Sequence, residues 1–182
     1  MSGAQFFNRI KPGLATAAIF AACVPLPAFA ATAPGNAEVT IVRPLSFVAD
    51  DNIEFGNVIR GTTAGTVTIA PDGTRTATGG VTLANGGNKP ASFAGMGTNN
   101  QRVDVSLGAA SIMITGPGAA MRVHTFVLGS TPTAVLTTTP QRFRISSSTG
   151  IFAFPVGATL DVGANQAAGQ YSGTWSITLN YF

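Results

Sequence analysis

The sequence predicts an all-β fold, an antiparallel β-sandwich, for everything after residue 30. Three observations support this prediction. The 182 residues include 22 glycines and 11 prolines, and only 9% are charged, which is typical of short strands joined by turns. Apolar residues recur at every second position in several short stretches. No stretch after Ala30 shows a helical period, and no linker-like segment divides residues 31–182, so we expect one domain there.

Residues 1–30 have the three parts of a secretory signal peptide. Arg9 and Lys11 supply the positive region, residues 13–24 the apolar region, and Ala28-Phe29-Ala30 the small-x-small cleavage site. Cleavage after Ala30 leaves 152 residues. We therefore expect an exported protein that passes through the periplasm to the cell surface or beyond, with its one substantial helix within the leader, roughly between residues 8 and 24.

Two alternatives to simple cleavage concern the membrane. A transmembrane anchor is disfavoured because the apolar run is about a dozen residues where a span needs roughly 20, and Pro25 and Pro27 interrupt it. Lipidation at Cys23 is the second alternative, although Phe20 fits a lipoprotein cleavage box poorly. Cys23 is the only cysteine, so the part after Ala30 has no disulfide, zinc-thiolate site or thiol nucleophile.

The first half of the domain contains four stretches with strand periodicity, separated by turn residues. In order, they are Val39 and Ile41 followed by Leu45 and Phe47 in a first strand bent at Pro44; Ile53, Phe55 and Val58; Val67 and Ile69, ending at the turn Pro71-Asp72-Gly73; and Val81 and Leu83, ending at the turn Asn85-Gly86-Gly87. The stretch 37–48 is therefore the candidate first strand.

The second half continues with strands at the spacing of a sandwich. The apolar positions are Phe93; Val103, Val105 and Leu107; Ile112 and Ile114; Val123, Phe126 and Leu128; Phe152 and Phe154, which end at Pro155; and Leu160 and Val162. Residues 163–169 have a glycine at both ends and no apolar face, which predicts a loop.

The strongest strand signal covers residues 170–182. Its odd positions are Tyr171, Gly173, Trp175, Ile177, Leu179 and Tyr181, whereas its even positions are mostly polar. Side-chain period two predicts that Trp175, Ile177 and Leu179 face the core. The segment lacks the charges and prolines that normally protect a strand edge, so we expect it to pair with another strand.

Residues for chemistry are scarce. The formal net charge of +3 falls to +1 without Arg9 and Lys11, which excludes the dense basic face of a nucleic-acid binder. His124 is the only histidine, and we expect it on a strand face opposite Val123, without a catalytic role. The acidic cluster Asp50–Glu54 lacks the ligand spacing of a calcium loop. We therefore expect neither enzymatic activity nor a cofactor or metal.

Four segments carry a resemblance to a known family. They are IVRPLSF (41–47), IEFGNV (53–58), GTVTIAPDGTRTATGGVTL (65–83) and VGATLDVGANQAAGQYSGTWSITLNY (156–181). Together they resemble the bacterial secreted domain-of-unknown-function family 4402, over essentially the whole exported chain. That family is similar to pilins of the alternative chaperone–usher pathway and, more distantly, to spore coat U-type domains.

The resemblance implies an immunoglobulin-like, pilin-like sandwich that polymerises by donor-strand exchange. The expected partners are further copies of the chain, a periplasmic chaperone and an outer-membrane usher. A penultimate tyrosine such as Tyr181 is usual in such C-terminal strands. Two features depart from the pattern: no cysteine pair is present, and few large apolar residues precede Val39. The donor is therefore expected within 37–48, unless the domain completes itself.

The leading hypothesis is thus a structural subunit of a fimbria-like surface fibre, with Val39, Ile41, Leu45, Phe47, Trp175, Ile177, Leu179 and Tyr181 as the residues of strand pairing or assembly. The alternative is a monomeric secreted or surface-attached adhesin that binds carbohydrate or another surface protein. A patch of exposed aromatic side chains would favour the adhesin. A pocket with two or more convergent acids would favour an enzyme.

Overall fold

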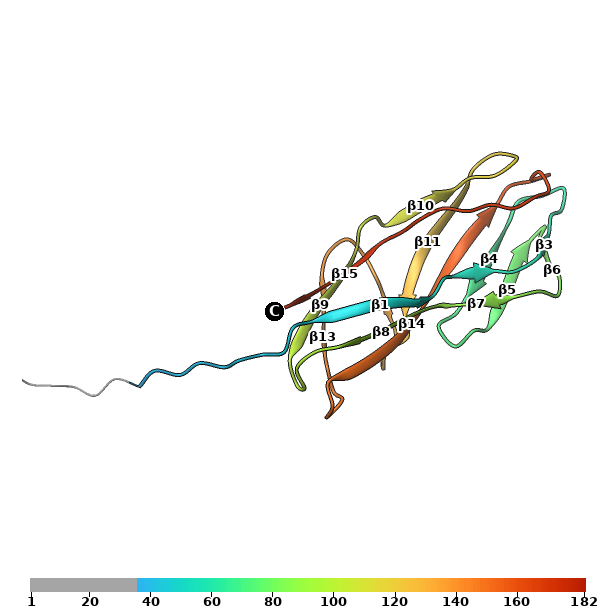
Figure 1. Cartoon of the computed structure of the whole chain (residues 1–182). Coiled ribbons are helices and arrows are strands. Elements are labelled where there is room, and N and C mark those ends of the chain that lie inside the picture. Colours follow the sequence, from blue (N-terminus) through green and yellow to red (C-terminus); the bar gives the residue numbers. More distant parts are fainter. Residues whose placement is uncertain (1–35) are drawn as a thin grey trace, which may run out of the picture. The chain divides into compact units, whose positions relative to one another are not determined.

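Two main antiparallel sheets pack around one apolar core, as the computed structural model shows (Figure 1). The strands are β1 (Ser46–Asp51), β2 (Glu54–Phe55), β3 (Val58–Ile59), β4 (Gly65–Ile69), β5 (Arg75–Gly79), β6 (Thr82–Leu83), β7 (Asn88–Lys89), β8 (Ala91–Met96), β9 (Arg102–Leu107), β10 (Ser111–Ile114), β11 (Met121–Leu128), β12 (Ala134–Val135), β13 (Gln141–Arg144), β14 (Ile151–Val162) and β15 (Ile177–Tyr181).

The larger sheet has the order β1-β8-β14-β11-β10. In it β4 pairs with β14 and with β5, and β12 pairs with β11. The smaller sheet has the order β13-β9-β15, and β2-β7 and β3-β6 form two short separate ladders. Strands β1 and β15 are therefore at edges of different sheets, and Figure 1 shows the start of β1 and the C-terminus at the same end of the sandwich.

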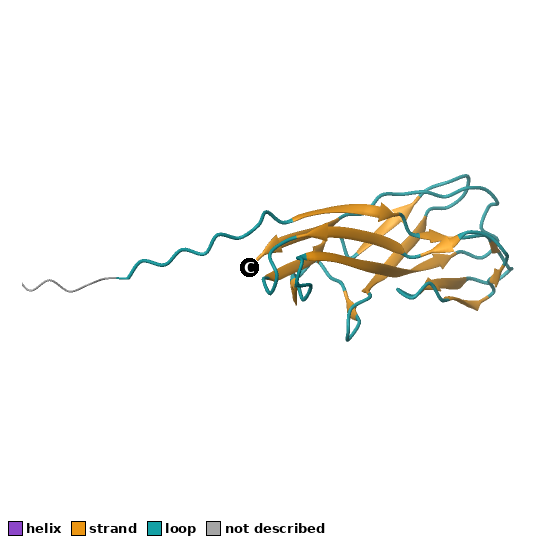
Figure 2. Cartoon of the chain, turned by 60° about the horizontal axis from the view of Figure 1, so that its bottom comes forward, coloured by secondary structure: helices purple, strands orange, loops and turns teal. Residues whose placement is uncertain are grey.

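The structure describes residues 36–182, and those from Thr40 to Phe182 form one compact unit. The predicted all-β antiparallel sandwich is confirmed, because the described chain contains strands and loops but no helix (Figure 2). Accordingly, no helix in this part is long and apolar enough to cross a membrane. The expected leader, its helix between residues 8 and 24, and Cys23 lie outside the described residues.

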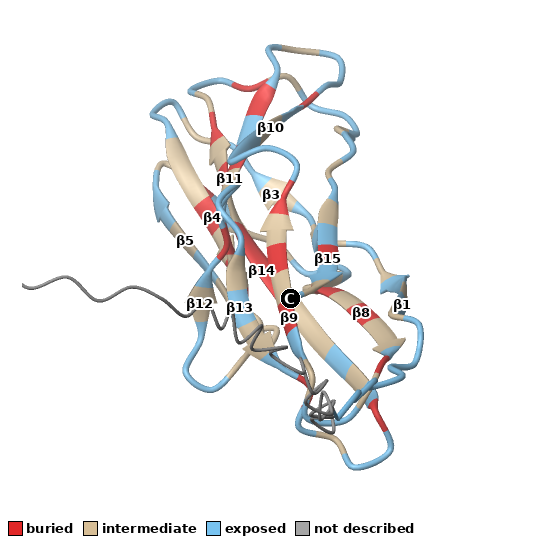
Figure 3. Cartoon of the chain, turned by 90° about the vertical axis from the view of Figure 1, so that its left-hand side faces the viewer, coloured by how far each residue is buried: buried red, intermediate tan, exposed pale blue. Residues whose placement is uncertain are grey.

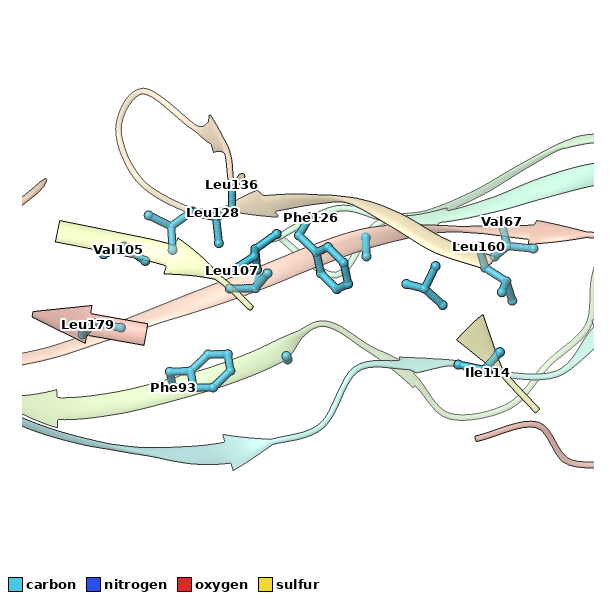
Figure 4. Packing of buried hydrophobic residues seen from close by; sticks show 14 of the residues in the cluster. Val67, Phe93, Val105, Leu107, Ile114, Phe126, Leu128, Leu136, Leu160 and Leu179 are labelled. Atoms are coloured by element: carbon cyan, nitrogen blue, oxygen red, sulfur yellow. The ribbon is translucent and has the colours of Figure 1, made fainter. Parts of the chain in front are cut away.

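Strand periodicity places the core residues. On β9, Val103, Val105 and Leu107 are at most 5% exposed, and the intervening side chains point outward. From the larger sheet Phe93 and Phe126 meet them in the same cluster (Figure 4). The buried positions lie along β8, β9, β11 and β14 (Figure 3), so both sheets contribute to one core.

A β-bulge in β11 explains an irregular apolar spacing in the sequence. Val123 and Phe126 are each 1% exposed although three positions separate them. The pairing with β14 shifts between His124 and Val127, and Thr125 has a φ of 53°. The bulge adds one residue to β11 and so changes which positions face inward. Side chains at odd positions before the bulge and at even positions after it therefore point into the same core.

Strand β14 corrects the expectation that Pro155 ends a strand. It runs unbroken through Pro155 for 12 residues, pairing first with β8 and then with β4 on one side. The oxygen of Pro155 accepts a hydrogen bond of 2.8 Å from the N–H of Gly129, just past the end of β11. Pro155 therefore lies where the ladder between β11 and β14 ends. A proline, which has no N–H to donate, is tolerated at such a position.

The sequence analysis did not predict β5 and β13. Their sequences are RTATG and QRFR, and neither contains two large apolar residues at alternate positions. Both strands follow from tertiary pairing, β5 with β4 and β13 with β9. The predicted turn between β4 and β5 is present: Gly73 has a φ of 86°, and the N–H of Thr74 donates to the Asp72 carboxylate at 2.9 Å.

Candidate functional site

A cleft of about 1220 Å³ opens along one flank of the sandwich. One rim is formed by the chain between residues 49 and 60, from the end of β1 through β3. The other rim is formed by the chain between residues 166 and 177, which leads into β15. Each rim spans twelve positions of the chain.

The floor of the cleft is the apolar core itself. It is lined by side chains from β8, β10, β11 and β14, namely Ala91, Phe93, Ile112, Ile114, Met121, Val123, Leu160 and Val162. All but one of these residues are buried members of the core cluster, and Ile112 is partly buried against it. Along the rims, Ile53, Phe55 and Ile177 are half-buried. The cleft therefore gives access to the side of the core between the two sheets.

Both rims contain backbone without sheet partners. Asn52 and Ile53 on one rim, and the three residues 173–175 on the other, line the cleft and belong to no strand. Among the described residues, their N–H and C=O groups make no hydrogen bond to another backbone group. Such groups stabilise a protein when a strand pairs with them. The cleft thus offers an apolar floor between two unpaired backbone segments.

The C-terminal strand is shorter than expected. The prediction of one strand over 170–182 is corrected to β15, Ile177–Tyr181, which pairs with β9. Upstream of it, Ser172 makes an isolated bridge with Thr115, and the backbone is free of strand pairing between Ser172 and β15. The predicted alternation is nevertheless present, because Leu179 is buried and Ile177 is half-buried, whereas the even positions are exposed.

Trp175 is packed on the core two residues before β15 begins. Its ring stacks on Phe126 at 4.8 Å between centroids and meets Phe93 edge-on at 5.6 Å. The packing of Trp175 therefore fixes the position of residues 173–175 against the core, although the backbone of Trp175 has no sheet partner.

Tyrosine hydroxyl groups hold the C-terminal segment on either side of the unpaired stretch 173–175. The hydroxyl of Tyr171 donates to the carbonyl of Ala167 at 3.0 Å and accepts from Gly118 N–H at 3.0 Å. The buried Gln166 amide also donates to it, at 2.9 Å. On the other side, the hydroxyl of Tyr181 donates to the carbonyl of Arg43 at 2.8 Å. The rim is therefore positioned without a strand in the cleft.

The N-terminal assembly residues divide at Pro44. Leu45 and Phe47 pack against the core, and β1 begins only at Ser46. Val39 and Ile41 belong to no strand of the described chain and are 85% and 90% exposed. The expected first strand over 37–48 is thus corrected to β1, Ser46–Asp51, which shares only residues 46–48 with the predicted range. Pairing of Val39 and Ile41 with another subunit stays a prediction.

Ionisable groups form ion pairs on the outer face of β11 and at one rim of the cleft. The Asp161 carboxylate accepts from Arg122 at 2.9 Å and lies 3.1 Å from His124 Nε2. His124 is on the face of β11 opposite the buried Val123, as the sequence analysis expected. The Lys89 ammonium lies 2.7 Å from Asp51 and 3.6 Å from Glu54, which raises the pKa of Lys89, chiefly through its hydrogen bond with Asp51. Among the described residues, no three His, Cys, Asp or Glu side chains are grouped to hold a metal.

Only one rim of the cleft was predictable from the sequence. Trp175 and Ile177 were expected to take part in strand pairing, whereas Ile53, Phe55 and Val58 were expected to form an ordinary strand. No role was expected for Arg43 and Thr98, which lie against Tyr181. For the rim formed by residues 49–60, the sequence signal is the short spacing of turn residues around Gly56. This spacing predicts interrupted strands but not a cleft.

Comparison with known proteins gives one match. The family model described as Domain of unknown function (DUF4402) covers residues 45–181, which includes both rims and the floor of the cleft. No curated protein and no solved structure matches the chain significantly. The chain therefore belongs to the DUF4402 family.

Proposed function

We propose that this protein is a structural subunit of a fimbria-like surface fibre in which neighbouring copies are joined by strand complementation. The observation that carries the proposal is the cleft: an apolar floor continuous with the core, between two rims that each contain a short stretch of backbone without a sheet partner, residues 52–53 and 173–175. A β-strand satisfies both features at once, because its backbone pairs with the rims and its alternate side chains cover the floor.

The size of the cleft also favours a strand over a small molecule. Small-molecule sites usually enclose roughly 300–1,000 Å³ and present a few convergent polar side chains. Here the volume is about 1220 Å³, and the floor is lined by aliphatic and aromatic residues. Two acids that line the cleft, Asp51 and Glu54, are on one rim, where each lies within 3.6 Å of the Lys89 ammonium.

The N-terminal segment supplies a suitable strand. Between the expected cleavage site and Arg43 there are twelve residues, 31–42. Ala37, Val39 and Ile41 alternate with polar residues, and both large side chains are exposed in the subunit. Burying each of them in a neighbour would contribute about 1.5–3 kcal/mol. In this proposal a strand of a periplasmic chaperone occupies the cleft during export, and an usher accompanies assembly. The likeness to chaperone–usher pilins is part of the same proposal.

The test places charge on one face of the segment or on the other. Val39→Asp with Ile41→Asp puts two carboxylates on the apolar face, and Asn36→Asp with Thr40→Asp puts two on the polar face. All four positions are exposed, so both double variants should fold. We expect surface fibres by electron microscopy, and multimers on gels, from the wild type and the control but not from the apolar-face variant.

Two results would contradict the proposal. One is a wild-type protein that remains monomeric on cells, which would instead favour the monomeric adhesin. The other is equal fibre formation by both double variants, because strand complementation requires the apolar face of the donor to be buried.

A further inference from the structure

Tyr181, on the edge strand β15, contacts the chain just before the edge strand β1, outside the residues that line the cleft. Its hydroxyl donates to the carbonyl of Arg43 at 2.8 Å and accepts from the N–H of Thr98 at 2.8 Å. The N–H of Arg43 in turn donates to Thr98 Oγ1 at 2.6 Å. The Arg43 guanidinium donates to the carbonyl of Thr149 at 3.2 Å. Both backbone polar groups of Arg43 are therefore fixed, just before β1 begins.

This attachment decides which cleft residues 31–42 can reach. To fill the cleft of their own subunit, they would have to reverse direction before β1 and run back along its free edge. A tight two-residue hairpin turn at Arg43-Pro44 is excluded, because type I′ turns need positive φ at both positions and Pro44 fixes φ near −65°. A type II′ turn needs glycine where Arg43 stands.

A wider turn remains geometrically possible, but it requires Arg43 to move. Such a turn would break the hydrogen bonds of Arg43 to Tyr181 and Thr98. The surroundings are also tight: a Cβ on Gly97 would meet the Tyr181 hydroxyl, Ile145 and Leu45. The backbone at Arg43 is thus held by one side-chain hydroxyl in a packed corner of the sandwich.

We propose that Tyr181 is the specificity-determining residue that makes strand complementation act between copies of this chain rather than within one copy. By holding Arg43, its hydroxyl keeps the segment 31–42 out of the cleft of its own subunit and available to a second copy. This inference rests on the proposed function, and it gives the penultimate tyrosine a role distinct from packing.

Crosslinking separates the two arrangements. The predicted mature chain contains no cysteine, so Thr40→Cys and Asn52→Cys introduce a single pair at exposed positions, one on the polar face of the donor segment and one on a rim. A short bis-maleimide crosslinker then gives a ladder of multimers when the donor lies in another copy, and a looped monomer when it lies in its own. Denaturing gels measure the ratio of ladder to looped monomer.

The pair is placed in three backgrounds: the natural residues, Tyr181→Phe, and Tyr171→Phe. Tyr171→Phe is the matched control, because it removes a tyrosine hydroxyl from the other side of the unpaired stretch 173–175. We expect mainly ladders with the natural residues and with Tyr171→Phe. Tyr181→Phe should lower the ratio of ladder to looped monomer about 2- to 10-fold, the range for losing one hydrogen bond. Thr98→Ala, which removes another bond to Arg43, should act in the same direction and covers the case in which Tyr181→Phe does not fold.

The possible failures are distinguishable. An unchanged ratio in both Tyr181→Phe and Thr98→Ala would overturn the role of Tyr181 but leave strand complementation between copies standing. Looped monomers with the natural residues would contradict both the role of Tyr181 and the proposed fibre. The absence of crosslinks to the rim in every background would remove the proposed function and this inference together.

Discussion

At the scale of single residues, Trp175 packs the C-terminal rim against the core through two aromatic contacts. It contacts Phe93 and Phe126, which lie on two different strands of the larger sheet. Trp175→Ala removes both aromatic contacts and leaves a cavity, so we expect it to lower the free energy of unfolding by about 3–5 kcal/mol. The exposed neighbour Ser176→Ala should change it by less than about 0.5 kcal/mol. Urea unfolding measures both, and an unchanged midpoint for Trp175→Ala would show that the rim does not pack as described.

A second residue-scale prediction concerns acid stability at Asp161. Partial burial raises the pKa of Asp161, but hydrogen bonds from Arg122 and His124 outweigh it and hold the pKa below its ordinary value of 3.8. Because the folded-state pKa is depressed, the stabilisation is present above about pH 3.8 and is lost as the pH falls through the folded-state value.

The measurement is the free energy of unfolding from pH 6 down to pH 2. Asp161→Asn should flatten the decline below about pH 3.8 relative to the wild type. Asp50→Asn is the control, since Asp50 is an exposed carboxylate outside the ion pairs of the described chain. A decline of the same steepness in Asp161→Asn and the wild type would contradict the prediction.

At the scale of elements, the short ladders β2-β7 and β3-β6 depend on a side chain from β5. The Arg75 guanidinium donates to the carbonyls of Phe55, Asn57 and Ala84 at 2.9, 3.3 and 2.6 Å. Two-residue strands are too short to hold each other, so this charged side chain supplies hydrogen bonds that their ladders cannot. Arg75 therefore supports the rim that includes Phe55.

We expect Arg75→Ala to destabilise the protein by about 2–4 kcal/mol, because hydrogen bonds to charged groups contribute roughly 1.5–3 kcal/mol each and are not additive. Amide hydrogen exchange should accelerate first between residues 54 and 59. Arg102→Ala, which removes an exposed arginine from β9, is the comparison. Equal exchange rates in the two variants would show that the rim is stable without Arg75.

At the scale of the whole molecule, the cleft predicts that the subunit is more stable with a strand than without one. A chain starting at Arg43 retains both rims but lacks residues 31–42. A synthetic peptide of those twelve residues should raise its Tm by several degrees, because a ligand at 100 times its Kd stabilises by about 2.7 kcal/mol. The same peptide with Val39→Asp and Ile41→Asp should have no effect. Equal shifts with both peptides would mean that binding does not use the apolar face.

The donor is available only if the leader is removed at the expected place. We predict that the exported protein begins at Ala31, since Ala28-Phe29-Ala30 has the small-x-small pattern of a cleavage site. Mass spectrometry of the exported protein decides this. An acylated N-terminus at Cys23 would instead show a lipoprotein, with its donor segment tethered to a membrane.

The fold class and the inward faces were predictable because side-chain period two is a local property. Alternation alone identified the buried residues of β4 and β9, and the inward positions around Trp175. The roles of Pro155 and Thr125 could not be predicted from the residues around them. Their effects depend on where a neighbouring strand ends or shifts, which a single segment does not encode.

The sequence by itself determined the all-β class, the alternating faces and the membership of residues 45–181 in the DUF4402 family. Only the tertiary structure decided that residues 49–60 and 166–177 line the same cleft, and that Tyr181 contacts Arg43 across 138 positions of the chain. The physical reason is that hydrophobic period acts between neighbours in sequence. A cleft, in contrast, forms where a partner strand is absent. This absence can be recognised only from the arrangement of the other strands.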